Sequence, residues 1–236
     1  MQKNKTKGFT LAEVLIVLGI IGVVAALSAP ALIQRAAAAK TGPAISRMIS
    51  TLSNGFQSYM QQNDADTVKF AKASIASNPV AIFEELANGH VKMKKESSSP
   101  LIKRSVGDTV GVVPSGKDMF VFADKSAVIL PTNSCDPVSG ELVAAEGGEG
   151  GAPAVLGGCK FYFLPMGYGS KDNIFLGDDS FEFAYDNKGE ILVYGLDYGT
   201  SWETDCSDSA IASFTPASDK STCGGRIVAN GYKKDY

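Results

Sequence analysis

The sequence predicts an α+β fold in which one long N-terminal helix packs on a small antiparallel β-sheet, the sheet forming a disulfide-bonded head. Three observations predict this fold. No charged residue occurs between positions 14 and 33, and the apolar residues that follow recur every three or four positions. The rest of the chain contains short runs of aromatic and β-branched residues separated by turn-forming residues. A length of 236 residues suits one core with an appendage.

Composition argues against two classes of function. The formal net charge of −3 does not suit a protein that grips nucleic acid phosphates, so nucleic acid is not an expected partner. The chain contains one histidine, His90, which removes most metal-binding and acid–base schemes that depend on imidazole. We therefore expect neither an enzyme nor a resident cofactor.

The first residues have the features of a membrane-inserted end. Lys3, Lys5 and Lys7 form a cationic flank without acids, which favours a cytoplasmic N-terminus. The uncharged stretch 14–33 matches the ~20 residues that a helix needs to cross a bilayer. A secretory signal peptide cut after Ala29 is the alternative, although a proline would then directly follow the cut.

Residues 7–14 distinguish these interpretations. They are Lys-Gly-Phe-Thr-Leu-Ala-Glu-Val, and they place Glu13 at the start of the apolar stretch, where an unpaired charge is costly in lipid. This block resembles the processing and N-methylation motif of type IV prepilins and of the pseudopilins of type II secretion systems. The resemblance implies a leader of residues 1–8, cleavage after Gly8 by a prepilin peptidase, and N-methylation of Phe9. It also implies that Glu13 pairs with the N-terminal ammonium of a neighbouring subunit during filament assembly.

The helix is expected to continue beyond the membrane, with a bend at Gly42–Pro43. The apolar residues that recur on one face are Ile45, Met48, Ile49, Leu52, Phe56 and Tyr59. The expected segments are a leader (1–8), a transmembrane and assembly half of the helix (9–33), an amphipathic half (34–63) and a globular pilin-like head (64–236). The resemblance implies local unwinding between Gly22 and Pro30 in a filament. A kink that the membrane helix tolerates is the other interpretation.

The head is expected to contain a short helix and an antiparallel sheet. Pro79 and Gly89 predict a helix over 79–88, and the polar, serine-rich stretch 92–100 predicts a loop. Turn-forming residues at 124–126 and 186–189 predict two hairpins. The strands are expected at 110–113, 119–123, 127–130, 160–164, 180–185 and 190–194.

Four cysteines lie outside the apolar stretch and lack the Cys-x-x-Cys spacing of metal or redox sites, so disulfides are expected. Their sequence positions allow three pairings. We expect Cys135–Cys159 and Cys206–Cys223, because sequential pairs close local loops.

Three aspartates between positions 172 and 179 are the candidate metal ligands. Asp172, Asp178 and Asp179 are oxygen donors of the kind that calcium prefers, and they lie among glycines. Some pseudopilins bind calcium in a loop just before a late strand. The resemblance implies that Asp178 and Asp179 lie in a comparable place. Solvated turn residues are the alternative, and both interpretations stay open.

The resemblance implies a structural subunit of a type IV pilus or of a type II secretion pseudopilus. Its implied partners are the prepilin peptidase, the inner-membrane assembly platform, the lipid bilayer, and other pilins or pseudopilins in a helical filament. Its implied location is the inner membrane, crossed once with the head in the periplasm, and then a filament at the cell surface or across the periplasm. The alternative is a filament-associated or membrane-anchored binding module, such as an adhesin or a DNA-uptake minor pilin. Loss of the leader lysines makes the mature chain more acidic, which weakens the DNA-uptake alternative.

Overall fold

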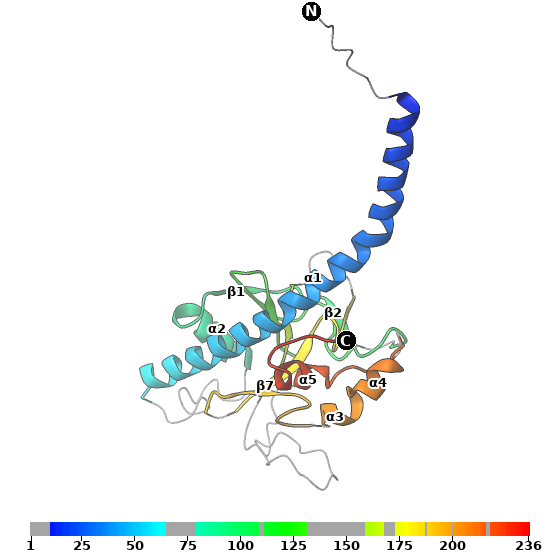
Figure 1. Ribbon diagram of the computed structural model, residues 1–236. Helices are drawn as coiled ribbons and strands as arrows, with labels where there is room; N and C mark the ends of the chain where they lie inside the picture. The colour runs from blue at the N-terminus through cyan, green and yellow to red at the C-terminus, as the bar shows by residue number, and fades with distance from the viewer. Residues whose placement is uncertain are drawn as a thin grey trace, which may run out of the picture.

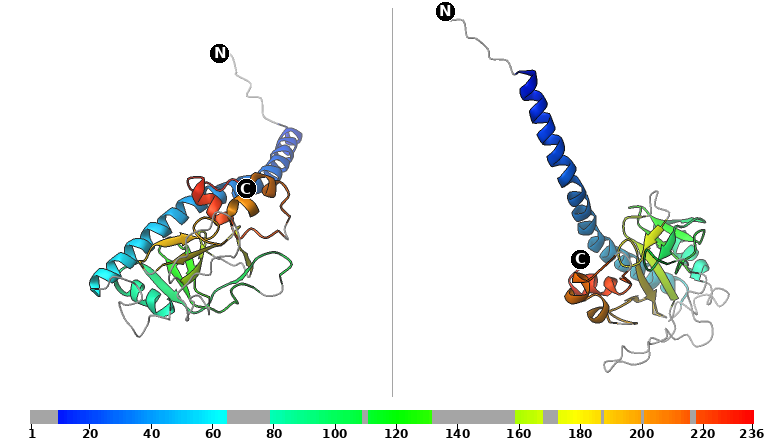
Figure 2. Two further views of the ribbon diagram at one scale, coloured as in Figure 1. Left: turned by 90° about the horizontal axis from the view of Figure 1, so that it is seen from below. Right: turned by 90° about the vertical axis from the view of Figure 1, so that its right-hand side faces the viewer.

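The computed structural model describes residues 10–64, 79–108, 111–131, 159–167, 173–186, 188–199, 201–215 and 218–236. Helix α1 (Leu11–Gln62) projects from a head that lies along its C-terminal part (Figure 1, Figure 2). The head contains a six-stranded antiparallel sheet and several short helices. This arrangement confirms the predicted α+β class.

Helix α1 is continuous over 52 residues, including Pro30 and the pair Gly42–Pro43. Figure 1 shows that it curves part-way along its length. The bend expected at Gly42–Pro43 therefore does not interrupt the helix. Gly42 lies directly against the backbone carbonyl of Tyr232, and a Cβ added there would overlap that carbonyl. Glycine at this position permits the close approach of the C-terminal segment to α1.

All neighbouring strands of the central sheet, in the order β1-β3-β4-β5-β7-β8, are antiparallel. The strands are β1 (Met93–Glu96), β3 (Met119–Phe122), β4 (Ala127–Ile129), β5 (Cys159–Leu164), β7 (Phe181–Tyr185) and β8 (Ile191–Val193). A separate parallel pair joins β2 (Leu101–Lys103) to β6 (Asn173–Phe175). Helix α2 (Pro79–Gly89) precedes the sheet and confirms the helix predicted over 79–88.

The sheet has a hydrophobic core on each face. On one face, the ring of Phe56 in α1 stacks on Tyr185 with centroids 4.6 Å apart and meets Phe83 of α2 edge-on at 6.1 Å. The predicted apolar face of α1 is buried in this core at Ile45, Met48, Leu52, Phe56 and Tyr59. On the other face, side chains of β4 and β5 pack against Ile102 of β2 and Ile174 of β6. Burial of each large apolar side chain stabilises the fold by roughly 1.5–3 kcal/mol.

Both hairpin turns predicted from the sequence are present. Between β3 and β4, Asp124 Oδ1 accepts the backbone N–H of Ser126 at 3.0 Å and its hydroxyl at 2.6 Å. Between β7 and β8, Asp186 Oδ1 accepts the backbone N–H groups of Lys188 at 2.9 Å and Glu190 at 2.8 Å. Aspartate favours such turns because its side chain can bond the backbone shortly after it.

The interpretation of residues 92–100 as a loop is wrong for residues 93–96, which form β1, whereas residues 97–100 lie in neither a helix nor a strand. β1 is an edge strand whose partner in the sheet is β3. Lys94 is exposed on it. Charged residues are common on edge strands, where they hinder pairing with further chains. The polar composition that suggested a loop is therefore compatible with an edge strand.

The prediction of a strand at 110–113 is also wrong for residues 111–113, which are the part that the structure describes. Val113 makes an isolated bridge to Ile102, whereas Gly111 and Val112 are not in a strand. A Cβ added at Gly111 would crowd the carbonyl of Ile102, so this segment packs closely beside β2. Val110 lies outside the described residues.

Three short helices that the sequence did not predict follow the sheet. They are α3 (Trp202–Asp205), α4 (Asp208–Ala212) and α5 (Cys223–Ala229). Ser201 and Ser207 cap the first two, because their hydroxyl oxygens accept the N–H groups of Glu203 and Ala210. In Figure 1 and Figure 2, α3 and α4 lie at the opposite end of the head from α2 and β1.

A disulfide joins Cys206, at the end of α3, to Cys223, the first residue of α5, which confirms this predicted pair. Cys159 at the start of β5 is also disulfide-bonded. Cys135 lies outside the described residues, so the pairing of Cys135 with Cys159 stays a prediction.

Candidate functional site

Helix α1 begins with a complete capping box. Thr10 Oγ1 accepts the backbone N–H of Glu13 at 3.3 Å, and Glu13 Oε2 accepts the backbone N–H of Thr10 at 2.8 Å. The Thr10 hydroxyl also donates to Glu13 Oε2 at 2.8 Å. These bonds satisfy amide groups that the start of a helix otherwise leaves without partners. Glu13 therefore has a hydrogen-bonding partner within its own chain.

The helix that follows this cap is apolar and exposed. The segment Leu11–Ser28 has a mean hydropathy of 2.5 and is not buried in the head. Leu11 is 80% exposed, Ile16 63% and Val23 62%. Among the described residues, α1 is the one helix that is long and apolar enough to cross a membrane. A helix that is apolar on every side needs lipid or other helices around it.

The remaining predicted residues of this region lie partly outside the described part of the chain. Gly8 and Phe9, the expected cleavage and methylation positions, are not described. Gly22 and Pro30 lie within α1, so the stretch between them is helical here. A Cβ added at Gly22 would meet no atom within 4 Å, so packing within this chain does not require glycine there. Unwinding of this stretch concerns a filament and stays a prediction.

Residues 3–29 match the family model described as the prokaryotic N-terminal methylation motif. The chain carries a prepilin-type motif. It is the cleavage and methylation motif of type IV pilins and pseudopilins, and its match includes Gly8, Phe9 and Glu13. The prepilin-type motif confirms the resemblance inferred from residues 7–14 and supports a type IV pilin-like or pseudopilin subunit. Comparisons with curated proteins and with solved structures found no match.

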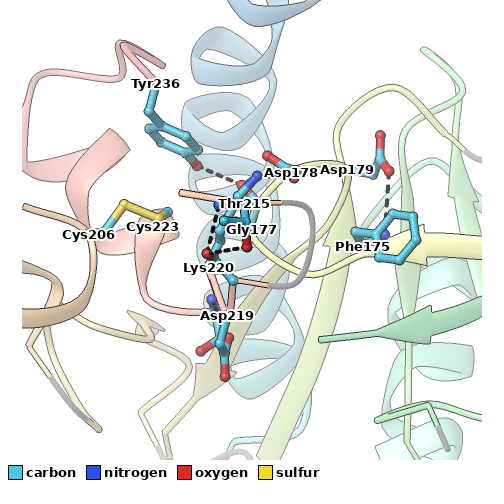
Figure 3. A network of polar contacts seen from close by, with 12 residues as sticks. Phe175, Gly177, Asp178, Asp179, Cys206, Thr215, Asp219, Lys220, Cys223 and Tyr236 are labelled. Atoms are coloured by element: carbon cyan, nitrogen blue, oxygen red, sulfur yellow. Dashed lines mark hydrogen bonds and ion pairs between the residues drawn. A yellow bond between two sulfur atoms is a disulfide. The ribbon is translucent and has the colours of Figure 1, made fainter. Parts of the chain in front are cut away.

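Two of the three candidate calcium ligands lie in the turn between β6 and β7 (Figure 3). Asp178 Oδ2 accepts a hydrogen bond from Lys220 Nζ at 2.6 Å, and Asp179 Oδ2 accepts one from the backbone N–H of Phe175 at 3.4 Å. Asp172 lies outside the described residues. Within the described part of the chain, no three His, Cys, Asp or Glu residues are grouped as metal ligands would be. Calcium binding stays untested.

The one histidine links two elements of the head. His90 Nδ1 lies 2.8 Å from Ser58 Oγ of α1, and its ring meets Tyr59 edge-on at 5.8 Å. It directly follows α2 and is partly exposed. The prepilin-type motif is one of structural proteins. Through its contacts with Ser58 and Tyr59, His90 has a packing role between α1 and α2.

A buried arginine that the sequence did not single out organises the C-terminal segment. Arg226 of α5 is 6% exposed, and its Nε and Nη2 each donate to the Asp235 carboxylate at 2.8 Å. Nη2 also donates to Asp208 at 2.6 Å, and Nη1 donates to the carbonyl of Cys206 at 2.9 Å. The hydrogen bonds from Arg226 hold the pKa of the Asp235 carboxyl below its usual range.

The lowered pKa predicts that the head loses stability in acid. A carboxylate with a lower pKa in the folded chain stabilises the fold above its ordinary pKa of 3.8, and this contribution disappears as the pH falls through the folded value. Asp235→Asn should lower the unfolding temperature of the detergent-solubilised full chain at neutral pH, and the difference from wild type should shrink below pH 3.8. Asp205→Asn, in an exposed position of α3, is the control. A deficit that is equal at neutral and acidic pH would contradict the assignment.

Proposed function

We propose that this protein is a structural subunit of a type IV pilus or of a type II secretion pseudopilus, which polymerises through helix α1. The observation that carries the proposal is the exposed apolar segment Leu11–Ser28 of α1. It starts with the capping box of Thr10 and Glu13 and lies within the match to the prepilin-type motif. The head leaves this segment uncovered. Insertion in a bilayer and then packing against the same helix of other subunits would each cover it.

Glu13 is the residue proposed to set the register between subunits. Cleavage after Gly8 would create an N-terminal ammonium on Phe9, one residue before the cap. Both hydrogen bonds from Thr10 use Oε2 of Glu13, and within the described residues its Oε1 accepts none. The carboxylate can thus keep the capping box and also accept the ammonium of a neighbouring subunit. Such a pair removes two unpaired charges from the apolar interior of a filament.

The proposal includes the route to the filament. The prepilin peptidase would cut after Gly8 and methylate Phe9 at the inner membrane, where the chain spans once with its head in the periplasm. An inner-membrane assembly platform would then add the subunit to a filament of pilins or pseudopilins. The cationic leader with Lys3, Lys5 and Lys7 supports this orientation. The alternative function, an adhesin or DNA-uptake module, stays a prediction.

Isolation of filaments from the native host tests the proposal. Filaments sheared from the cell surface and filaments retained in the periplasm are labelled with antibodies against the head and viewed by electron microscopy. We expect labelling along the filament length, and its location separates a surface pilus from a periplasmic pseudopilus. A chain found only as dispersed membrane protein, under conditions in which filaments form, would contradict the proposal.

A further inference from the structure

Three oxygen atoms at the turn between β6 and β7 accept N–H groups of the turn's own backbone. The carbonyl of Phe175 accepts the N–H groups of Asp178 at 3.3 Å, Asp179 at 2.9 Å and Ser180 at 3.2 Å. The N–H of Gly177 donates to the carbonyl of Ser180 at 2.7 Å. Asp179 Oδ2 accepts the N–H of Phe175 at 3.4 Å. The turn is therefore closed without an added ion.

Two lysine ammonium groups from the C-terminal segment lie against the same turn. Lys220 Nζ donates to Asp178 Oδ2 at 2.6 Å. Lys234 Nζ donates to the backbone carbonyl of Asp178 at 2.8 Å and lies 3.9 Å from its Oδ1. The side chains of Lys220 and Lys234 are only 18% and 12% exposed. Limited access of water makes these charge interactions stronger than those of fully exposed pairs.

The last residue of the chain adds a third contact to the turn. The hydroxyl of Tyr236 donates to the carbonyl of Gly177 at 2.7 Å, as Figure 3 shows. Burial raises the pKa of this hydroxyl well above its usual value, so it remains a donor. A Cβ added at Gly177 would overlap the carbonyl of Lys220, because the two backbones are in direct contact there. We call residues 220–236 the C-terminal clasp.

A calcium ion does not fit these residues. Calcium takes about six to eight oxygen ligands at ~2.3–2.6 Å. Asp178 Oδ2, the carbonyl of Asp178 and the carbonyl of Gly177 each already accept a donor from the clasp. An ion bonded to these oxygens would also stand beside two ammonium groups, which would repel it.

We propose that Lys220 and Lys234 take the place of a metal ion at this turn, so that the chain supplies its own cations. The clasp also connects the turn to α1, because the carbonyl of Tyr232 lies directly against Gly42. The turn is then closed without calcium, and the C-terminal residues add a contact with α1 to the direct packing of the sheet on that helix.

Thermal unfolding in calcium and in chelator tests the proposal. The full chain and its Asp178→Asn variant are compared in detergent, with saturating calcium or with EGTA. We expect the calcium-dependent shift in unfolding temperature to be the same in both proteins, including no shift in either. A larger calcium-dependent rise in the wild type than in Asp178→Asn would show a calcium ion at Asp178 and would overturn the proposal.

A double-mutant cycle tests the lysine itself. Lys220→Met keeps the aliphatic stem but removes the ammonium, and Asp178→Asn removes the carboxylate charge. We expect each variant to unfold at a lower temperature and the double variant to lose no more than the larger single loss. Lys94→Met, on the exposed edge strand β1, is the matched control and should leave the unfolding temperature unchanged. Additive losses at Lys220 and Asp178 would contradict a direct pair.

Discussion

Glu13→Ala is expected to reduce filament incorporation on the order of a hundredfold. An unpaired charge is costly in an apolar interior, and the equilibrium constant for adding a subunit falls exponentially with that free-energy cost. The ammonium of Phe9 would lose its partner, and the cap at Thr10 would lose both bonds to the carboxylate. Membrane insertion and cleavage after Gly8 should continue. The measurement is the ratio of sheared filament protein to processed membrane protein on immunoblots from a strain without the wild-type gene.

Two further variants isolate the role of the Glu13 charge. Glu203→Ala makes the same change at an exposed position of α3 and should leave filament yield unchanged. Thr10→Val removes the hydroxyl that bonds Glu13 but keeps the carboxylate, so it should impair assembly less than Glu13→Ala. Normal filament yield from Glu13→Ala would remove Glu13 from the assembly mechanism.

Replacement of the confirmed disulfide by two alanines, Cys206→Ala with Cys223→Ala, should cost about 3 kcal/mol of head stability, since the bridged residues are 17 positions apart. For a head of this size, that loss corresponds to a fall in unfolding temperature of about 6–12 °C. The bridge lies beside Arg226, which bonds the carbonyl of Cys206, so the loss should extend to the C-terminal clasp. The measurement is thermal unfolding followed by near-ultraviolet circular dichroism.

N-terminal processing is the internal control for this disulfide variant. The motif around Gly8 and Phe9 is far along the chain from α5, so leader removal should proceed at the wild-type level. A reduced but folded wild-type chain with an unchanged unfolding temperature would contradict the stabilising role of the bridge.

The parts of the fold that the sequence predicted have strong local signals. Helix α1 was predictable because apolar side chains recur at helical spacing from Ile45 to Tyr59 and are buried on one face. The hairpins at Asp124 and Asp186 were predictable because each aspartate bonds the backbone of its own turn. The N-terminal motif was predictable because the cationic leader, Gly8, Glu13 and the apolar stretch follow one another directly in the chain, and the family model matches residues 3–29.

The parts that the sequence did not predict depend on contacts between distant residues. β2 and β6 pair in parallel although Leu101 and Asn173 are far apart in the chain, and each strand is short. α3 and α4 have serine caps but no buried residues to give a helical period. Arg226 has no local feature that indicates burial, because its partners Asp208 and Asp235 are brought to it by the fold.

The surroundings of the candidate calcium ligands also depend on residues that are distant in the chain. Asp178 and Asp179 have the residue type of hard-cation ligands, although their spacing does not match an EF-hand loop. The side-chain and carbonyl oxygens of Asp178 accept hydrogen bonds from Lys220 and Lys234, which lie 42 and 56 positions later in the chain. A pattern within one loop carries no information about such donors, so the choice between metal and ammonium needs the tertiary structure.

The mature N-terminus tests the central claim most directly. Intact mass measurement and N-terminal fragmentation are carried out on the protein from its native host, with Gly8→Val, in which a bulky side chain should block the peptidase, as the uncleaved reference. We predict a chain that begins at Phe9 with an N-methylated amine, and a Gly8→Val chain that keeps its leader. A wild-type chain that begins at Met1, or one that begins near Pro30, would contradict the prepilin pathway.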